Sequence, residues 1–203
     1  MKRFSLIASL LILIYFPVAA FSAGDTATCD TKYPVVMAHG MGAQAKIVDI
    51  VDYWWGLEDA LEEEGADVYI TSVNGMDTTA NKAASFKKQV LEILAISGKS
   101  KANVIGHSHG TIYTRYAISN LGLAPYVASY TGLSGPHRGS SVADFIFKMV
   151  PNQGWTLVGD ALDIVYTFVM GDENPNSLEN GMEMTRPYMQ NVFNANCPDV
   201  AGL

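Results

Sequence analysis

The sequence has few basic side chains and few cysteines, and both shortages limit what the protein does. It carries 13 lysine and arginine residues against 20 aspartate and glutamate residues, a formal net charge of −7. Nucleic acids are held mainly by clusters of basic side chains, so this balance argues against a nucleic-acid partner. A neutral, apolar substrate is unaffected by such a charge. The two cysteines, Cys29 and Cys197, either pair with each other or need partners outside this chain.

The N-terminus has the layout of a secretory signal peptide. Lys2 and Arg3 precede a largely apolar run at 4–16, and small residues follow up to Ala23. The run is too short for a helix that crosses roughly 30 Å of hydrocarbon, which argues against the alternative of a membrane anchor. We therefore expect residues 1–23 to be a signal peptide and the protein to be secreted.

Short β-rich runs alternate with longer helical runs between residues 33 and 134. The pattern predicts strands at 34–38, 68–73, 102–106 and 126–133, separated by helices at 52–65, 78–97 and 109–121. Strands separated by helices are typical of right-handed crossovers and hence of a parallel sheet. We therefore expect an α/β fold whose mostly parallel sheet is flanked by helices.

This alternation stops after Gly139, and two further helices are expected at 142–150 and 155–170. The second is strongly apolar, but Asp160 and Asp163 interrupt it, and a charge at mid-bilayer costs several kcal/mol. This cost argues against a membrane span. Two interpretations remain open for this helix, a core helix and a lid whose apolar face covers an active site. We assign residues 24–203 to one domain, with a helical lid region at about 141–195.

The strongest functional signal is the segment Gly106-His107-Ser108-His109-Gly110. A G-x-S-x-G pattern is weak alone, but here it follows an expected strand and opens an expected helix, the setting of a nucleophile elbow. A serine on such a turn is strained and leaves little room for neighbouring Cβ atoms, which explains both glycines. We predict that Ser108 is a nucleophile and that Gly106 and Gly110 form its elbow. The alternative is an ordinary helix-capping serine.

A second segment, His39-Gly40-Met41-Gly42, directly follows the first expected strand. In an α/β fold with a nucleophile elbow, this loop supplies a backbone N–H to the oxyanion of the tetrahedral intermediate. We predict that the backbone N–H groups of Met41 and His109 form the oxyanion hole. Preorganised donors of this kind are worth about 3–4 kcal/mol each. The alternative for this loop is a plain tight turn.

The stretch from Pro34 to about Ser141 resembles the secreted, foldase-dependent bacterial triacylglycerol lipases. The matching segments are YPVVMAHGMG at 33–42, VDYWWGLEDAL at 51–61, GADVYITSV at 65–73, LAISGKSKANVIGHSHGT at 94–111 and GPHRGS at 135–140. The resemblance implies an α/β-hydrolase that cleaves long-chain acylglycerols through an acyl-enzyme on Ser108, with Met41 and His109 as oxyanion donors. It also implies export through the periplasm, a helical lid, and folding assisted by a lipase-specific foldase chaperone.

No general base or acid is identifiable. A catalytic serine needs a histidine oriented by a carboxylate, and in α/β-hydrolases both follow the serine along the chain. Of the four histidines, His39, His107, His109 and His137, only His137 lies clearly downstream of Ser108. The resemblance implies that the catalytic acid, the catalytic histidine and the aspartates of a structural calcium site lie beyond Leu203. We therefore expect an incomplete domain that lacks its last strands and has no metal ligand or cofactor of its own.

Three functions remain open from the sequence. The first is a lipase that is active when complete. The second is a smaller esterase in which His137 serves as the base. The third is a catalytically incomplete hydrolase-like protein that binds lipid or a chaperone. The sequence carries no signal for an oligomer.

Overall fold

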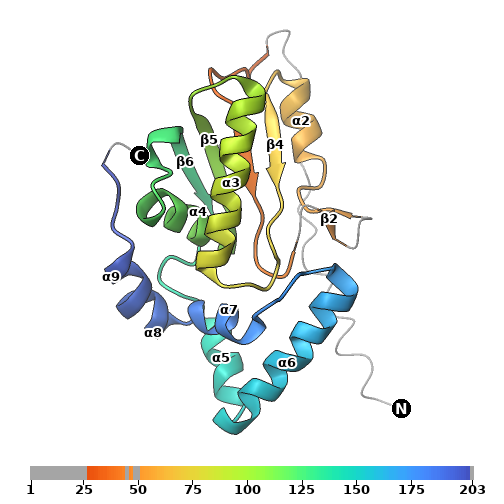
Figure 1. The fold of residues 1–203 in the computed structure, drawn as a ribbon, viewed down its shortest axis with the longest axis vertical. Coiled ribbons are helices and arrows are strands. Elements are labelled where there is room, and N and C mark those ends of the chain that lie inside the picture. The colour runs from red at the N-terminus through yellow and green to blue at the C-terminus, as the bar shows by residue number, and fades with distance from the viewer. Residues whose placement is uncertain (1–26, 44–45, 48–50, 202–203) are drawn as a thin grey trace.

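The computed structural model describes residues 27–43, 46–47 and 51–201, so the predicted signal peptide lies outside the described residues. Four parallel strands form one sheet in the order β4-β1-β5-β6 (Figure 1). The strands are β1 (Val35–Ala38), β4 (Val68–Thr71), β5 (Ala102–His107) and β6 (Val127–Leu133). The predicted fold class and all four predicted strands are confirmed. A short antiparallel pair, β2 (Lys46–Ile47) and β3 (Val51–Asp52), was not expected from the sequence.

Helices cover both faces of the sheet and its carboxyl edge. They comprise α2 (Leu57–Glu63), α3 (Thr79–Ser97), α4 (His109–Asn120), α5 (Ser141–Met149), α6 (Trp155–Val165), α7 (Ser177–Glu183), α8 (Arg186–Tyr188) and α9 (Asn194–Asn196). Single turns or π-helical segments complete the set at η1 (Ala124–Tyr126), η2 (Asn152–Gly154), η3 (Tyr166–Met170) and η4 (Met189–Phe193). In Figure 1, α3 and α4 lie across one face of the sheet, and α5, α6 and α7 lie beyond the ends of the strands.

The side chains of β1 alternate between two cores. Val36 and Ala38 pack in the cluster that includes the apolar faces of α3 and α4, whereas Val35 and Met37 pack with Trp54 on the other face. All four β1 residues are buried, as expected for a central parallel strand that helices cover on both sides. Burial of each valine or methionine side chain of β1 stabilises the fold by about 1.5–3 kcal/mol.

Helix α3 matches its prediction closely because its ends carry strong signals. The side chain of Thr78 accepts a hydrogen bond from the backbone N–H of Asn81, which caps the N-terminus. Gly98 ends the helix in the left-handed conformation, with φ of 66°. The buried face repeats at helical spacing through Ala83, Phe86, Val90, Ile93 and Leu94.

The helix predicted over 52–65 is shorter than expected and begins only at Leu57. The carboxylate of Asp52 accepts the backbone N–H groups of Trp54 and Gly56, which favours a turn over a helix. This turn buries Trp54 and leaves Trp55 exposed.

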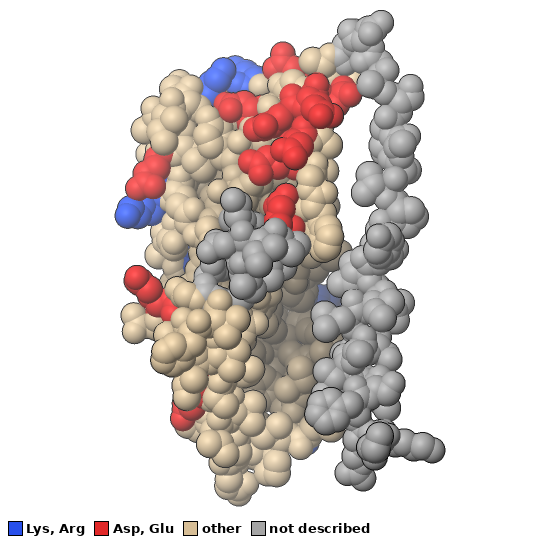
Figure 2. Space-filling view, turned by 90° about the vertical axis from the view of Figure 1, so that its right-hand side faces the viewer, with Lys and Arg blue, Asp and Glu red and all other residues tan. Residues whose placement is uncertain are grey.

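Acidic side chains gather over this part of the surface (Figure 2), on α2 and the residues after it, at Glu58, Asp59, Glu62, Glu63 and Glu64.

The strongly apolar segment predicted over 155–170 forms α6 and continues as the π-helical segment η3. Gly159 is the buried residue of α6, and the large side chains of Leu157 and Phe168 face outward, so this is not a core helix. Within the described part of the chain, no helix is both long and apolar enough to cross a membrane.

Gly110 allows α4 to approach β1, and its substitution tests this packing. A Cβ atom on Gly110 would collide with the carbonyl oxygen of Ala38 and lie 2.7 Å from that of His39. Backbone atoms cannot rotate away, so we expect Gly110→Ala to lower the free energy of unfolding by about 3 kcal/mol, the upper end of ordinary overpacking. Urea denaturation followed by tryptophan fluorescence measures this. Gly154→Ala is the control, because its Cβ would meet only Val150, at 3.3 Å. Equal stability of the two variants would contradict the packing argument.

Candidate active site

Ser108 occupies a strained turn between β5 and α4. Its φ of 54° and ψ of −124° are unusual for a residue with a Cβ atom, and such strain costs about 1–3 kcal/mol. The backbone around it is pinned, because Ser108 donates its N–H to Leu133 and its carbonyl accepts the Thr111 hydroxyl at 2.7 Å. The Ser108 side chain makes no capping hydrogen bond to α4, so it is not an ordinary capping serine. The strand–turn–helix setting predicted from the sequence is present.

The two glycines of the motif pack against each other beneath this turn. A Cβ atom on Gly106 would lie 2.8 Å from backbone atoms of Gly110 and Thr111. Gly110 in turn lies against the backbone of β1. The turn therefore needs glycine at both positions, which is the steric reason inferred from the sequence.

The loop after β1 lies directly against Ser108. A Cβ atom on Gly40 would be 3.0 Å from the Cβ of Ser108 and 3.4 Å from its Oγ. Met41, Ser108 and His109 line one cavity. Among the described residues, no acceptor forms a hydrogen bond with the backbone N–H of Met41 or with that of His109. The structure thus brings the serine and the two residues whose amides the sequence singled out to the same cavity. The N-terminus of α4, where negative charge is favoured, lies at the same place.

His39 supports this loop from within the protein. Its Nε2 accepts the backbone N–H of Val73 at 3.1 Å, so the proton is on Nδ1, which donates to the Gly40 carbonyl at 2.9 Å. The ring is fully buried, and burial lowers the pKa of His39 to about 4. His39 is therefore a neutral structural residue and not a proton acceptor for catalysis.

Tyr53 is a second support for this loop, and no pattern in the sequence predicts it. Its hydroxyl accepts the backbone N–H of Gly40 at 2.9 Å and bonds the Nδ1 of His107 at 2.5 Å. Because the hydroxyl accepts from Gly40, its own proton is free to go to His107. Tyr53 thus joins the loop after β1 to the residue before Ser108. Its place in the unexpected turn after β3 carries no sequence signal for this role.

None of the hydrogen bonds among the described residues joins a histidine to the Ser108 hydroxyl. His109 is fully buried with both ring nitrogens bonded elsewhere, and His107 is bonded to Tyr53. His137 packs against Gly135 beside Thr111 and does not line the cavity. Burial, and secondarily the nearby Arg115 cation, lower the pKa of His137.

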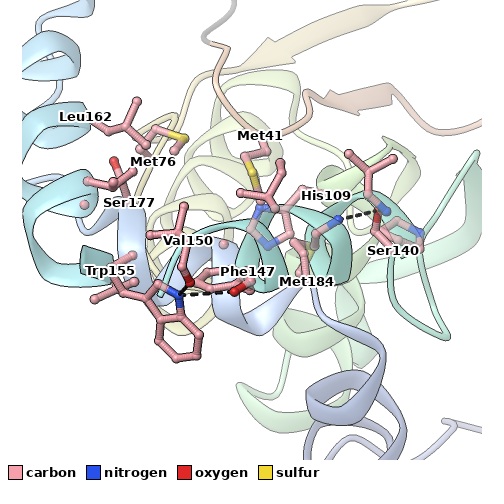
Figure 3. A pocket seen from close by; sticks show the side chains of 18 of the residues that line it. Met41, Met76, His109, Ser140, Phe147, Val150, Trp155, Leu162, Ser177 and Met184 are labelled. Carbon is pink, nitrogen blue, oxygen red and sulfur yellow. Dashed lines mark hydrogen bonds between the residues drawn. The ribbon is translucent and has the colours of Figure 1, made fainter. Parts of the chain in front are cut away.

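The cavity beside Ser108 has a volume of about 450 Å³ and is walled mainly by apolar side chains of α5, α6 and α7 (Figure 3). The lining includes Met41, Met76, Ile146, Phe147, Trp155, Leu162 and Met184. The indole Nε1 of Trp155 donates to the Val150 carbonyl at 2.7 Å, which joins the ends of α5 and α6. Such a cavity suits an extended apolar group.

The described residues contain no group of three His, Cys, Asp or Glu side chains placed to hold a metal ion. The carboxylates near the cavity are bonded to protein groups. Asp172 accepts the N–H groups of Gly75 and Met76, and Asp163 accepts that of Ser177. Cys29 and Cys197 are both free thiols in the structure. The calcium ion implied by the family resemblance therefore does not fit the described residues.

Comparison with protein families identifies one model, described as alpha/beta hydrolase fold, that matches residues 33–174. The chain is 38% identical to the triacylglycerol lipase of Burkholderia plantarii over 128 residues, which are 61% of this chain and 35% of that protein. It is 33% identical to the triacylglycerol lipase of Vibrio cholerae over 140 residues, 68% of this chain and 44% of that protein. The matched region thus spans less than half the length of these relatives.

Solved structures show the same fold at lower identity. A metagenomic carboxyl esterase superposes with a TM-score of 0.66 at 16% identity, covering 95% of this chain and 53% of that one. A Bacillus licheniformis lipase in its mature form superposes with a TM-score of 0.61 at 19% identity, covering 84% of this chain and 61% of that one. The identities of 38% and 33% to the two triacylglycerol lipases above confirm the resemblance to bacterial triacylglycerol lipases noted in the sequence.

The protonation state of His39 predicts sensitivity to acid. Between pH 6.5 and about 4 the unfolded chain binds a proton at this ring and the folded protein does not, so stability falls as the pH is lowered. One pKa unit is about 1.4 kcal/mol, so the loss from this residue is roughly 3 kcal/mol. We expect His39→Gln, which keeps one donor and one acceptor, to unfold with a flatter pH dependence over this range. Parallel curves for the two proteins in urea titrations at several pH values would contradict the assignment.

Proposed function

Because the chain belongs to the alpha/beta hydrolase fold family, we propose that it hydrolyses the carboxylic esters of long-chain acylglycerols through an acyl-enzyme on Ser108. The observation that carries the proposal is the strained Ser108 turn at the edge of an apolar cavity, next to two backbone amides that bond no acceptor among the described residues. Relatives named triacylglycerol lipase support the substrate class.

In the proposed mechanism, the Oγ of Ser108 attacks the ester carbonyl carbon and its proton passes to a base. The carbonyl oxygen becomes an oxyanion, which accepts hydrogen bonds from the backbone N–H groups of Met41 and His109. Collapse of this intermediate breaks the ester C–O bond, the base returns the proton to the leaving oxygen, and the alcohol departs with the acyl group left on Ser108. Water then attacks the acyl-enzyme through a second oxyanion, which frees the acid and restores the serine. We assign the base to no residue, because no histidine ring is bonded to Ser108 among the described residues.

The proposed acyl site is the apolar cavity under α5, α6 and α7. A buried methylene is worth about 0.8 kcal/mol, so a long acyl chain gains binding energy that a short one lacks. The cavity walls offer few polar groups that could bind a polar substrate in place of water, apart from hydroxyls such as that of Ser134. This composition favours a lipase over an esterase of small polar substrates.

We extend the proposal to secretion and to assisted folding. The signal-peptide pattern at 1–23 supports export, and the triacylglycerol lipase relatives support a lipid ester as the extracellular substrate. A foldase partner rests on the family resemblance alone. The same holds for a structural calcium ion, which would need ligands from outside the described residues.

The nucleophile is tested by Ser108→Ala. We expect the variant to lose hydrolysis of p-nitrophenyl esters by at least about a thousandfold, since the acyl-enzyme cannot form. A fluorophosphonate probe should label the parent at Ser108 and leave the variant unlabelled. Ser134→Ala is the matched control, because Ser134 lines the same cavity and should keep most activity. A parent protein that binds lipid vesicles but is neither labelled nor active would instead support the non-catalytic, lipid-binding function.

The acyl site is tested by shortening the cavity with Leu162→Trp. For the parent, kcat/KM should rise with acyl length by up to about fourfold per methylene until the cavity is filled. The variant should prefer shorter esters, because the indole takes space that the distal methylenes would fill. Leu157→Trp is the control, on the same helix but outside the lining and largely exposed. If both variants keep the parent's chain-length profile, the cavity is not the acyl site.

A further inference from the structure

Lys82 is a charged side chain in a place that disfavours charge. It lies in the first turns of α3 and only 1% of it is exposed. Burial of an ammonium group costs several kcal/mol unless it is well paired, and a cation near a helix N-terminus is opposed by the helix dipole. No pattern in the sequence indicates a role for this residue. Its contacts show what the burial achieves.

The ammonium group of Lys82 has three protons, and three acceptors surround it. Its Nζ lies 2.7 Å from the carbonyl oxygen of Gly75, 3.2 Å from Nδ1 of His109 and 3.5 Å from Oδ1 of Asn180. The acceptors come from the loop before α3, the first residue of α4, and α7. One side chain therefore joins three segments that are distant in sequence.

The first of these contacts leads to the loop that contains Met41. The Gly75 carbonyl that accepts from Lys82 also accepts the backbone N–H of Gly42, at 2.9 Å. Gly42 is the residue after Met41, so its hydrogen bond restricts the peptide unit that directly follows the Met41 amide. Gly75 also lies so close to Ala43 that a Cβ atom on it would be 2.9 Å from the Ala43 carbonyl oxygen.

The second contact leads to the other proposed oxyanion donor. The Thr79 hydroxyl donates to Glu183 at 2.7 Å, so it accepts from Nε2 of His109 at 3.0 Å. This fixes the proton of the ring on Nε2 and leaves Nδ1 to accept from Lys82. Burial, and then the nearby Lys82 charge, hold the pKa of His109 well below its usual range, so the ring stays neutral. Both ring nitrogens are thus held, and with them the start of α4.

We propose, on the premise of the proposed function, that Lys82 is a positioning residue that fixes the backbone amides of Met41 and His109 relative to each other. Lys82 also connects both amides to helix α7 over the cavity. One connection is its hydrogen bond to Asn180, and the other runs from the His109 ring through Thr79 to Glu183. Lys82 contacts neither substrate nor reacting atoms. Its effect passes through Gly75 to one amide and through the His109 ring to the other.

The charges around Lys82 are consistent with this role. Burial lowers the pKa of Lys82 to about 7, whereas Asp172, Asp77 and Glu183 oppose this shift by stabilising the ammonium form. His109 and His39 are the other titratable groups beside it, and both are neutral. Below about pH 7 all three acceptors have a donor, and above it the amine has only two protons to give. An arginine at this position would keep its charge throughout.

The kinetic test compares Lys82→Met with Lys87→Met. Lys87 is the matched control, because it lies on the same helix and its Nζ also donates to a backbone carbonyl, that of Leu121 at 2.7 Å, away from the cavity. We expect Lys82→Met to lower kcat on a p-nitrophenyl ester by about tenfold or more with KM within about threefold, since loss of one oxyanion donor costs about 10²–10³ in kcat. Lys87→Met should keep kcat. Lys82→Arg should recover part of the loss and extend activity to higher pH.

A second measurement does not depend on activity. Hydrogen exchange of the Gly42 backbone amide, followed by NMR, should be at least about tenfold faster in Lys82→Met than in the parent. The amide of Val36, in the centre of the sheet, should be unchanged. If Lys82→Met does not give a cooperative thermal melt, Lys82→Gln replaces it, because its amide also lacks charge but can still donate two hydrogen bonds.

The two measurements distinguish a failure of the proposed function from a failure of the positioning role of Lys82. A parent without Ser108-dependent hydrolysis would count against the proposed function, and the Gly42 exchange comparison would still decide whether Lys82 holds the loop. Unchanged kcat in a folded Lys82→Met variant of an active parent, equal losses in Lys82→Met and Lys87→Met, or unchanged Gly42 exchange would each overturn the positioning role.

Discussion

The close approach of α4 to β1 is the constraint on which the rest of the site depends. Gly110 lies against the backbone of Ala38 and His39, and Gly106 lies against Gly110. This packing leaves Ser108 no regular conformation between strand and helix, so its backbone takes a positive φ. The strain is carried by the hydrophobic cluster beneath it, in which β1, β5, α3 and α4 share one core. A looser helix would relax the turn and separate Ser108 from the loop after β1.

The site divides into an apolar side and a polar side. The cavity next to Ser108 is lined by methionine, leucine and aromatic side chains, whereas the groups behind the two proposed oxyanion donors form a buried polar network. Such a network is costly unless its members are satisfied, and here the Thr79, Lys82 and His109 side chains all have partners. Catalysis by preorganised amides needs this rigidity, because a donor that must reorient at each turnover loses its advantage.

The sequence predicted the strands, the main helices and the turn at Ser108 because their signals are local. Thr78 and Gly98 mark the ends of α3, and the glycines around Ser108 leave no other compact arrangement. The turn at Asp52–Gly56 was missed because a side-chain-to-backbone hydrogen bond outweighed an apparent helical pattern. The roles of Tyr53 and Lys82 were missed for a different reason. Each depends on partners far along the chain, such as His107 and Asn180, that no spacing rule connects.

The helices over the cavity are held in a different way from the sheet. Only Gly159 of α6 is buried, and α6 is tied to α7 by the hydrogen bond from the Ser177 N–H to Asp163 and by the contact of Gly159 with Leu178. Little apolar surface is removed from water by these ties, so the helices contribute little to the stability of the fold. Their inner apolar faces gain a full set of contacts only when another apolar group occupies the cavity. A bound acyl chain would supply that burial, at about 0.8 kcal/mol per methylene. In the proposed function, the apolar lining of the cavity would therefore be the source of the affinity for the acyl chain.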